Sequence, residues 1–308
     1  MTVSHAQGGY GERPSVLTQL YEDVCPSVVA FISKLLPLPA GQQPVFPEIF
    51  GTGFLVNDNG LVATNRHVVE VFDQVGRHPQ TGEFAGAALM FLVEADKHGC
   101  QMLNIGVKSW GAIDSFSSFS EWYGQTVPDI GFVQLEVKET PFLELAVEDF
   151  YLRPGMEIAT IGYPLGTAPL TLHGKINQVG PFIRRGIVSS VYPFATPRPH
   201  GFTIDIMQQG GSSGSPIFAA DSPKVVGMMW GGINEPRFAQ SEAASLMYTL
   251  NTNISLAEPA HIIRAALETV LATEQPDRAS IPTLQQLRDA YPRPNENTGF
   301  SWSSTPVY

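Results

Sequence analysis

Short apolar runs, separated by polar and turn-forming residues, recur along this chain. The first begins at Val28 and reads Val-Val-Ala-Phe-Ile-Ser, and similar runs follow at 53–56, 61–64, 88–93 and 130–135. β-Branched and aromatic residues are frequent in these runs, which is typical of strands. Short strands joined by turns favour an antiparallel barrel or sandwich over alternating strands and helices.

A second series of such runs occupies the later part of the chain. Its members lie at 156–162, 170–179, 187–192, 202–206, 216–218, 225–229 and 245–250. The stretch Glu136–Pro154, between the two series, predicts a connection between two barrels. In the first series, Asp58-Asn59-Gly60 predicts a hairpin turn, with His67 just beyond the second strand of that hairpin. The pattern therefore predicts an all-β fold made of two units.

Two segments have the apolar spacing of helices. Residues 15–24 carry apolar side chains at helical intervals before Pro26, which predicts a short helix. Further on, Ser255-Leu256-Ala257-Glu258 has the spacing of a capping box, and Pro259 suits a first helical turn. An apolar face follows it, so we predict a helix that ends near Glu274 and closes the second barrel.

These elements divide the chain into four parts. We predict an N-terminal lead with the short helix over 1–23, the first barrel over 24–140, the second barrel with its helix over 141–274, and a tail over 275–308. The tail contains five prolines and four aromatic residues. Its composition is compatible with disorder, but four aromatic side chains are more than a solvated tail needs, so docking onto the body or onto a partner is the alternative.

Composition limits the classes of partner. Hydrophobic residues make up 43% of the 308 residues, which excludes wholesale disorder, and the net charge of −11 supplies no basic field for a nucleic acid. Cys25 and Cys100 are too few for a disulfide framework, which predicts a reduced compartment, the cytoplasm. Met1 to Pro14 lacks the apolar core of a secretory signal. The sequence contains no run of eighteen apolar residues, so it predicts no membrane span.

One stretch differs from every other in the chain. Residues 208–216 read Gln-Gln-Gly-Gly-Ser-Ser-Gly-Ser-Pro, a series of small or polar residues that cannot form a buried strand or a helix interior. Such a sequence predicts a tight turn that exposes backbone N–H groups. A hydroxyl in this turn could attack a carbonyl while the amides stabilise the resulting oxyanion. A serine and glycine loop without chemistry is the alternative.

Two upstream segments make the chemical interpretation more specific. One runs from Gly51-Thr52-Gly53-Phe54 to Thr64-Asn65-Arg66-His67-Val68-Val69, and the other is Pro128-Asp129-Ile130-Gly131-Phe132-Val133-Gln134-Leu135. With the serine stretch, and in this order, they resemble the trypsin-like (chymotrypsin-fold) serine proteases, most closely the bacterial high-temperature-requirement (HtrA-type) branch. The resemblance spans roughly residues 24 to 273. It implies two six-stranded antiparallel β-barrels, without the peptide-binding PDZ domain that this branch usually appends.

The resemblance implies roles for individual residues. His67 would be the general base, Asp129 its orienting acid and Ser213 the nucleophile, because a serine hydroxyl needs a base that a third group holds in one tautomer. Asp96 and Asp114 are the alternatives to Asp129. The oxyanion donors would be the backbone amides of Gly211 and Ser213.

A different serine motif competes for the nucleophile. The pattern G-x-S-x-G fits residues 210–214 and would make Ser212 the nucleophile of an α/β-hydrolase. That fold needs its acid and its histidine after the serine, and His261, inside a predicted helix, is the one histidine downstream. Ser212 also departs from the family, which has Asn or Asp there. Without an aspartate at that position, activation through an ion pair with a new N-terminus is not expected.

Specificity is predicted from the same resemblance. The pocket floor would be Met207, and the segment Trp230-Gly231-Gly232 would form the walls. A thioether floor without counter-charge predicts a preference for medium apolar side chains. Asp205 lies two residues from Met207, and its carboxylate in the pocket would instead select lysine or arginine.

We therefore predict a serine endopeptidase that hydrolyses protein or peptide substrates through an acyl-enzyme. A catalytically silent module that binds peptides and an esterase with the same triad are the alternatives. No cofactor and no metal are expected, since His98-Gly99-Cys100 lacks the paired spacing of a zinc site. Neither nucleic acid nor membrane is expected as a partner, whereas a regulatory or targeting protein would suit a chain without an appended peptide-binding domain.

Overall fold

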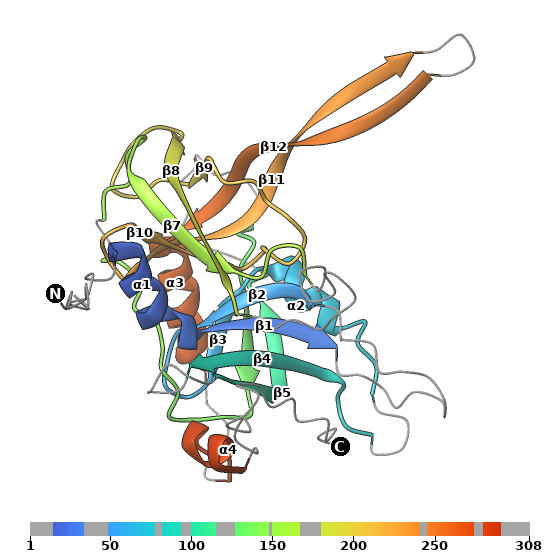
Figure 1. Ribbon diagram of the computed structural model, residues 1–308, viewed down its shortest axis with the longest axis vertical. Coiled ribbons are helices and arrows are strands. Elements are labelled where there is room, and N and C mark those ends of the chain that lie inside the picture. Colours follow the sequence, from blue (N-terminus) through green and yellow to red (C-terminus); the bar gives the residue numbers. More distant parts are fainter. Residues whose placement is uncertain are drawn as a thin grey trace, which may run out of the picture.

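The computed structural model describes residues 15–33, 49–77, 82–93, 100–114, 127–147, 150–166, 180–240, 245–273 and 280–290. Within these ranges the chain folds into two closed, six-stranded antiparallel β-barrels followed by a helix, so the predicted fold class is confirmed. In Figure 1 the first barrel lies below the second. Among the described residues, no helix combines the length and the apolar content needed to span a lipid bilayer.

The first barrel closes through pairing of its first and fourth strands. Its strands, in spatial order, are β1 (Val28–Ser33), β2 (Ile49–Leu55), β3 (Leu61–Thr64), β6 (Gly131–Leu135), β5 (Cys100–Ala112) and β4 (Gly86–Val93). The predicted turn at Gly60, which has φ +72°, joins β2 to β3. The side chain of Asn57 stabilises this turn by accepting the N–H groups of Asn59 and Leu61. Fully buried apolar side chains such as Phe31 and Leu55 fill the interior.

The apolar runs predict no strand between residues 93 and 130, and this is wrong for part of that range. Residues 100–112 form β5, which pairs with β4 through one part of its length and with β6 through another. Polar residues such as Gln101, Asn104 and Lys108 interrupt the apolar pattern of this strand, so the local sequence does not indicate it. Pairing with two neighbours supplies the backbone hydrogen bonds that stabilise it.

The second barrel repeats this order of strands. It contains β7 (Glu157–Gly162), β8 (Phe182–Tyr192), β9 (Gly201–Ile204), β12 (Ser245–Pro259), β11 (Val225–Gln240) and β10 (Pro216–Ala219), and it closes through β10 and β7. Buried side chains such as Phe202, Ile217 and Met229 fill its interior. The predicted strand at 170–179 lies outside the described residues.

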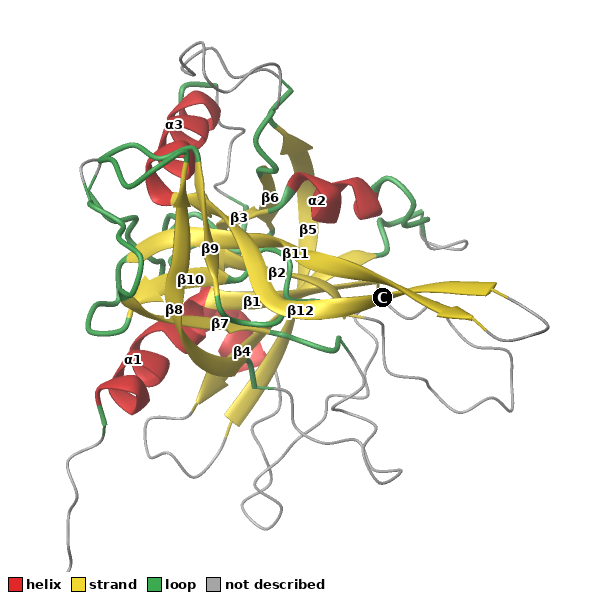
Figure 2. Ribbon diagram, turned by 90° about the horizontal axis from the view of Figure 1, so that it is seen from above, coloured by secondary structure: helices red, strands yellow, loops and turns green. Residues whose placement is uncertain are grey.

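One hairpin extends far beyond this barrel. β11 and β12 remain paired from Asn234 opposite Asn251 to Gln240 opposite Ser245, and this part, which we call the arm, pairs with no third strand among the described residues. Figure 1 and Figure 2, seen from two directions, both show the arm projecting away from the two barrels.

The first residue of each helix depends on a local side-chain cap or on where strand pairing ends. Ser15 accepts the N–H of Thr18 at 3.2 Å and starts α1 (Val16–Val24), which leads into the short η1 (Cys25–Ser27). The predicted capping box at 255–258 is wrong: those residues belong to β12, and α3 (Ala260–Leu271) begins after Pro259. Ser255 pairs with Ile204 and Gly232 on opposite sides, and this ladder outweighs the local capping signal.

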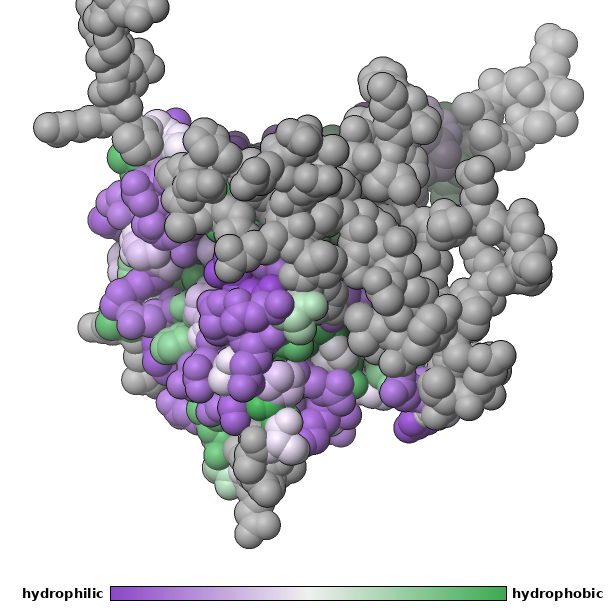
Figure 3. Space-filling view, turned by 60° about the horizontal axis from the view of Figure 1, so that its bottom comes forward, coloured by the Kyte–Doolittle hydropathy of each residue, from purple (hydrophilic) through white to green (hydrophobic). Residues whose placement is uncertain are grey.

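Part of the predicted tail packs on the first barrel. Thr283 and Gln286 exchange backbone-to-side-chain hydrogen bonds of 2.9 and 3.1 Å, a capping box that starts α4 (Leu284–Ala290). Leu284 is buried against the first barrel and donates its N–H to the carbonyl of Lys138. Figure 3 shows the underside of the molecule, where the described surface is mostly hydrophilic with small apolar patches. Residues 291–308 lie outside the described ranges.

Candidate active site

His67 lies on the outer face of a short helix that follows β3. In α2 (Arg66–Phe72) the apolar residues Val68, Val69 and Phe72 are buried against the first barrel. Their spacing leaves the neighbouring His67 on the exposed side, and 46% of its side chain is accessible to solvent. The sequence after the β2–β3 hairpin therefore presents an imidazole at the surface of the barrel.

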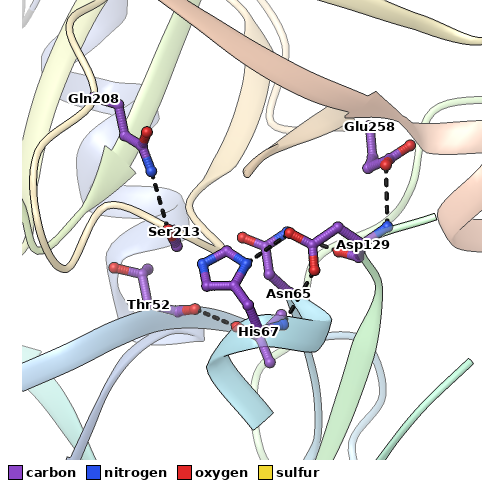
Figure 4. Close-up of polar contacts among 8 residues, drawn as sticks. Thr52, Asn65, His67, Asp129, Gln208, Ser213 and Glu258 are labelled. Atoms are coloured by element: carbon purple, nitrogen blue, oxygen red, sulfur yellow. Dashed lines mark hydrogen bonds and ion pairs between the residues drawn. The ribbon is translucent and has the colours of Figure 1, made fainter. Parts of the chain in front are cut away.

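Asp129 lies just before β6 and holds this imidazole. Its Oδ1 accepts the backbone N–H of His67 at 3.1 Å, and its Oδ2 lies 2.6 Å from Nδ1 of the ring (Figure 4). Asn65 donates its side-chain amide to the Asp129 carbonyl at 2.9 Å. A carboxylate at Nδ1 favours a proton on that nitrogen and leaves Nε2 as the basic site.

The alternative aspartates do not occupy this position in the described residues. Asp114 has a side chain that is 94% exposed, and it forms a 2.6 Å ion pair with Arg66. Asp96 lies outside the described residues. Of the aspartates considered, Asp129 is therefore the one that the described structure brings to His67.

Ser213 lies in a turn that is hydrogen-bonded to the first barrel. Thr52 of β2 donates its backbone N–H to the Ser213 carbonyl at 2.8 Å, and Gly214 donates its own N–H to Met229 at 2.9 Å. Gly214 has φ +86°, and a Cβ at this position would lie 1.9 Å from the carbonyl oxygen of Thr52. A glycine is therefore required at this position for the turn to lie close to β2.

The backbone amides of Gly211 and Ser213 are the predicted oxyanion donors. Neither N–H donates a hydrogen bond within the part of the chain that the structure describes, although the Ser212 N–H between them donates to Gln209 at 3.0 Å. The Thr52 hydroxyl donates to the Gly211 carbonyl at 2.7 Å and fixes that peptide. Gly211 adopts φ +84°, which favours glycine.

The Ser213 hydroxyl has a partner that the sequence did not indicate. Gln208 donates its side-chain amide to Oγ of Ser213 at 3.2 Å. Figure 4 shows this hydroxyl on the side of the imidazole opposite to Asp129, and no hydrogen bond among the described residues joins it to His67. Nothing in the sequence distinguishes Gln208 from Gln209, so the spatial position of the side chain was needed to find it.

Ser212, the other candidate nucleophile, accepts a hydrogen bond from a half-buried arginine. Arg184 of β8 donates to Oγ of Ser212 at 3.2 Å and to the Met207 carbonyl at 2.6 Å. Ser212 is fully buried. Desolvation by burial lowers the pKa of Arg184 to about 10. Arg184 thus forms hydrogen bonds with both ends of segment 207–212, which precedes Ser213. The sequence pattern predicts no role for this arginine.

Glu258 lies behind the aspartate, on the side away from His67. The Asp129 N–H donates to Oε1 of Glu258 at 3.2 Å, and Oε2 is buried without a hydrogen-bond partner among the described residues. Burial is the main reason why the pKa of Glu258 rises to about 7, and the charge of Asp129 raises it further. The sequence pattern had suggested a helix cap for this residue.

A cavity of about 190 Å³ opens beside the serine turn. Its lining residues come from the turn and from the base of the arm, and they are Gln208, Gln209, Gly210, Gly232, Ile233, Asn234, Asn251 and Thr252. Of the predicted pocket residues, Gly232 lines this cavity, but Met207, Trp230 and Gly231 do not. The Asp205 carboxylate accepts the backbone N–H of Ile187 at 2.5 Å and is not among the lining groups either.

Comparison with known proteins gives a consistent family. The family "trypsin-like peptidase domain" matches residues 51–228, which include all three motifs. A protein of Halomonas elongata described as "Probable periplasmic serine endoprotease DegP-like" is 24% identical over 209 residues, or 67% of this chain and 34% of that protein. This chain therefore spans about a third of that relative's length.

Two solved structures are also similar to this chain, at low sequence identity. The "HtrA-type protease AlgW with decapeptide" has a TM-score of 0.48 and 14% identity, over 82% of this chain and 66% of that chain. A variant of AlgW with tripeptide has a TM-score of 0.46 and 15% identity, over 83% of this chain and 64% of that chain.

Proposed function

The chain belongs to the family of trypsin-like peptidase domains, and from this premise we propose that it is a serine endopeptidase that acts through an acyl-enzyme. One arrangement carries the proposal. The Asp129 carboxylate lies 2.6 Å from Nδ1 of His67, while the Ser213 hydroxyl lies on the opposite side of the ring (Figure 4). A base held between an acid and a hydroxyl is what nucleophilic catalysis by serine requires.

In the proposed reaction, Oγ of Ser213 attacks the carbonyl carbon of the scissile peptide bond. Nε2 of His67 accepts the hydroxyl proton and then donates it to the departing amine, which leaves an ester on Ser213. Water then attacks this ester by the same route and releases the carboxylic acid. Asp129 holds the ring in one tautomer and stabilises the imidazolium.

The amides of Gly211 and Ser213 are proposed to bind the oxyanion. Both donors are free in the described structure, so they need not break another hydrogen bond when charge develops on the substrate oxygen. The bond from Thr52 to the Gly211 carbonyl keeps this peptide in place before substrate binds. Donors that are already oriented stabilise a developing charge without a cost of reorganisation.

The side chain of Gln208 orients the Ser213 hydroxyl for this reaction. Because its amide donates to Oγ of Ser213, the hydroxyl uses one lone pair as an acceptor and keeps its own proton available for His67. The contact between Ser213 and His67 would form when substrate closes the site, since hydrogen bonds between catalytic groups are often long in the absence of substrate.

A fluorophosphonate probe tests this function. We expect it to label the wild-type protein at Ser213, and we expect no label in Ser213→Ala. The Ser212→Ala variant is the matched control and should keep the label, because Ser212 faces Arg184 and not the imidazole. Unlabelled wild-type protein should cleave unfolded casein, and labelling of Ser213 should abolish this cleavage. A label on Ser213→Ala that disappears in Ser212→Ala would refute the assignment of the nucleophile.

Compartment and partners are separate parts of the proposal. We keep the cytoplasm as the proposed compartment because the chain has two cysteines, of which Cys25 is a buried free thiol. The name of the Halomonas relative places that protein in the periplasm, so it offers no support for this proposal. Cell fractionation distinguishes the two. A peptide segment of a protein is the proposed substrate, and a regulatory or targeting partner is proposed as well.

A further inference from the structure

The arm contains none of the residues that carry the proposed chemistry. It is a two-stranded ribbon, and such a ribbon is marginally stable in water unless something packs against it. Large apolar side chains are nevertheless exposed on it, with 71% of Phe238 and 64% of Met247 accessible to solvent. Exposed apolar side chains on a projecting ribbon indicate a surface for binding.

The strand register sorts these side chains onto two faces. Directly opposed residues of an antiparallel pair lie on the same face, and residues two apart along a strand do so as well. One face therefore carries three opposed pairs: Asn234 with Asn251, Pro236 with Thr249, and Phe238 with Met247. We call this the cavity face. The other face carries Glu235 with Leu250 and Arg237 with Tyr248, including an ion pair of 2.8 Å between Glu235 and Arg237.

The cavity face continues directly from the cavity beside Ser213. Asn234 and Asn251, the first pair on this face, also line that cavity. Gln208, which also lines the cavity, donates to the Ser213 hydroxyl. The cavity thus lies between the nucleophile and the face of the arm that carries the exposed apolar pair.

The cavity itself is neutral and polar. Five of its eight lining residues carry a side-chain amide or hydroxyl, the other three are Gly210, Gly232 and Ile233, and no ionisable residue is among them. Amides offer both donors and acceptors, so they satisfy a neutral polar side chain. A charged side chain would lose its hydration without gaining a counter-charge, and a large apolar one would leave the amides without partners.

We propose that the cavity face of the arm binds the substrate polypeptide, so that an extended segment places a neutral polar side chain in the cavity and an apolar side chain on Phe238 and Met247. The proposal rests on the proposed function. From Asn234 to Phe238 the strand rises about 13 Å, which an extended peptide covers in about four residues. Side chains four residues apart in an extended peptide point the same way, so both can face the protein at once.

Matched peptides test the docking surface. Each peptide carries glutamine at the cleaved bond. A second position, either four residues before or four residues after this glutamine, carries phenylalanine or alanine. On one of the two sides, phenylalanine should raise kcat/KM about tenfold over alanine in the wild-type protein. This ratio should fall to about one in Phe238→Ala/Met247→Ala. It should be unchanged in Tyr248→Ala/Leu250→Ala, the matched control that removes two apolar side chains from the opposite face.

Equal ratios in all three proteins, or an equal loss in both double variants, would overturn the docking surface. So would a fall in molecular mass of the Phe238→Ala/Met247→Ala variant in solution with an unchanged ratio, because the face would then join copies of this chain. A second peptide series varies the residue at the cleaved bond. Glutamine or asparagine should exceed lysine, glutamate and leucine by about tenfold, and a dominant preference for any of those three would refute the neutral polar cavity.

Failure of the proposed function gives a different result. In that case no peptide is cleaved, and fluorescence anisotropy of labelled peptides decides the docking proposal. The phenylalanine peptide should then bind about tenfold more tightly than the alanine peptide to the wild-type protein, and equally to Phe238→Ala/Met247→Ala. Cleavage with no effect of the distant phenylalanine would refute the docking proposal and leave the proposed function intact.

Discussion

Replacing Glu258 by glutamine should change how stability depends on pH. Burial raises the pKa of this carboxyl from its ordinary value of 4.5 to about 7, so the folded protein retains the proton where the unfolded chain has lost it. Stability contributed by the neutral carboxyl is complete below pH 4.5 and is lost as the pH rises to about 7. At about 1.4 kcal/mol for each pH unit, the loss amounts to about 3 kcal/mol.

The glutamine variant lacks this loss but keeps the local geometry. Its side-chain oxygen can still accept the Asp129 N–H that Glu258 accepts at 3.2 Å. The difference in free energy of unfolding between Glu258→Gln and the wild-type protein should therefore increase by about 3 kcal/mol in favour of the variant between pH 4.5 and pH 8. Taking the difference at each pH cancels the titration of all carboxyl groups that behave alike in both proteins.

Chemical denaturation at several pH values measures this difference. Glu157→Gln is a suitable control, because its carboxylate belongs to the same barrel but is 59% exposed and pairs with Arg185 at the surface. That variant measures the effect of removing one carboxylate at the surface of the same barrel. Parallel curves for Glu258→Gln and the wild-type protein would refute the reasoning, since they would mean that Glu258 titrates alike in the folded and unfolded chains.

Three further substitutions test the geometry around the serine. Asp129→Asn should lower kcat about 10⁴-fold at neutral pH without unfolding the protein, because an amide favours the wrong tautomer of His67; a neutral-pH kcat close to wild type would contradict this role. Thr52→Val removes the hydroxyl that donates to the Gly211 carbonyl and accepts the Tyr163 N–H. We expect the free energy of unfolding to fall by about 1–3 kcal/mol, measured by denaturation, and kcat to fall as well, measured by steady-state kinetics. Gly214→Ala puts a methyl group 1.9 Å from the Thr52 carbonyl, and it should abolish fluorophosphonate labelling, whereas retained labelling would show that the turn can shift.

Much of the fold could be predicted because barrel strands leave a local signal. Apolar runs such as Val28–Ser33 and the turn at Asp58-Asn59-Gly60 reflect burial and backbone conformation, which neighbouring residues determine. Where that signal was weak, prediction failed. The polar residues within β5 concealed a strand, and the apparent capping box at 255–258 is a strand because two neighbouring strands pair with it.

The sequence by itself determined which residue types could act, and it supplied His67, Asp129 and Ser213 in the order typical of their family. Only the tertiary structure decided what surrounds them. The hydrogen bond from Thr52 to Gly211 joins residues 159 positions apart, and the one from Asp129 to Glu258 joins residues 129 apart. Such contacts leave no local pattern, because they depend on how two barrels pack together and on the register of their strands.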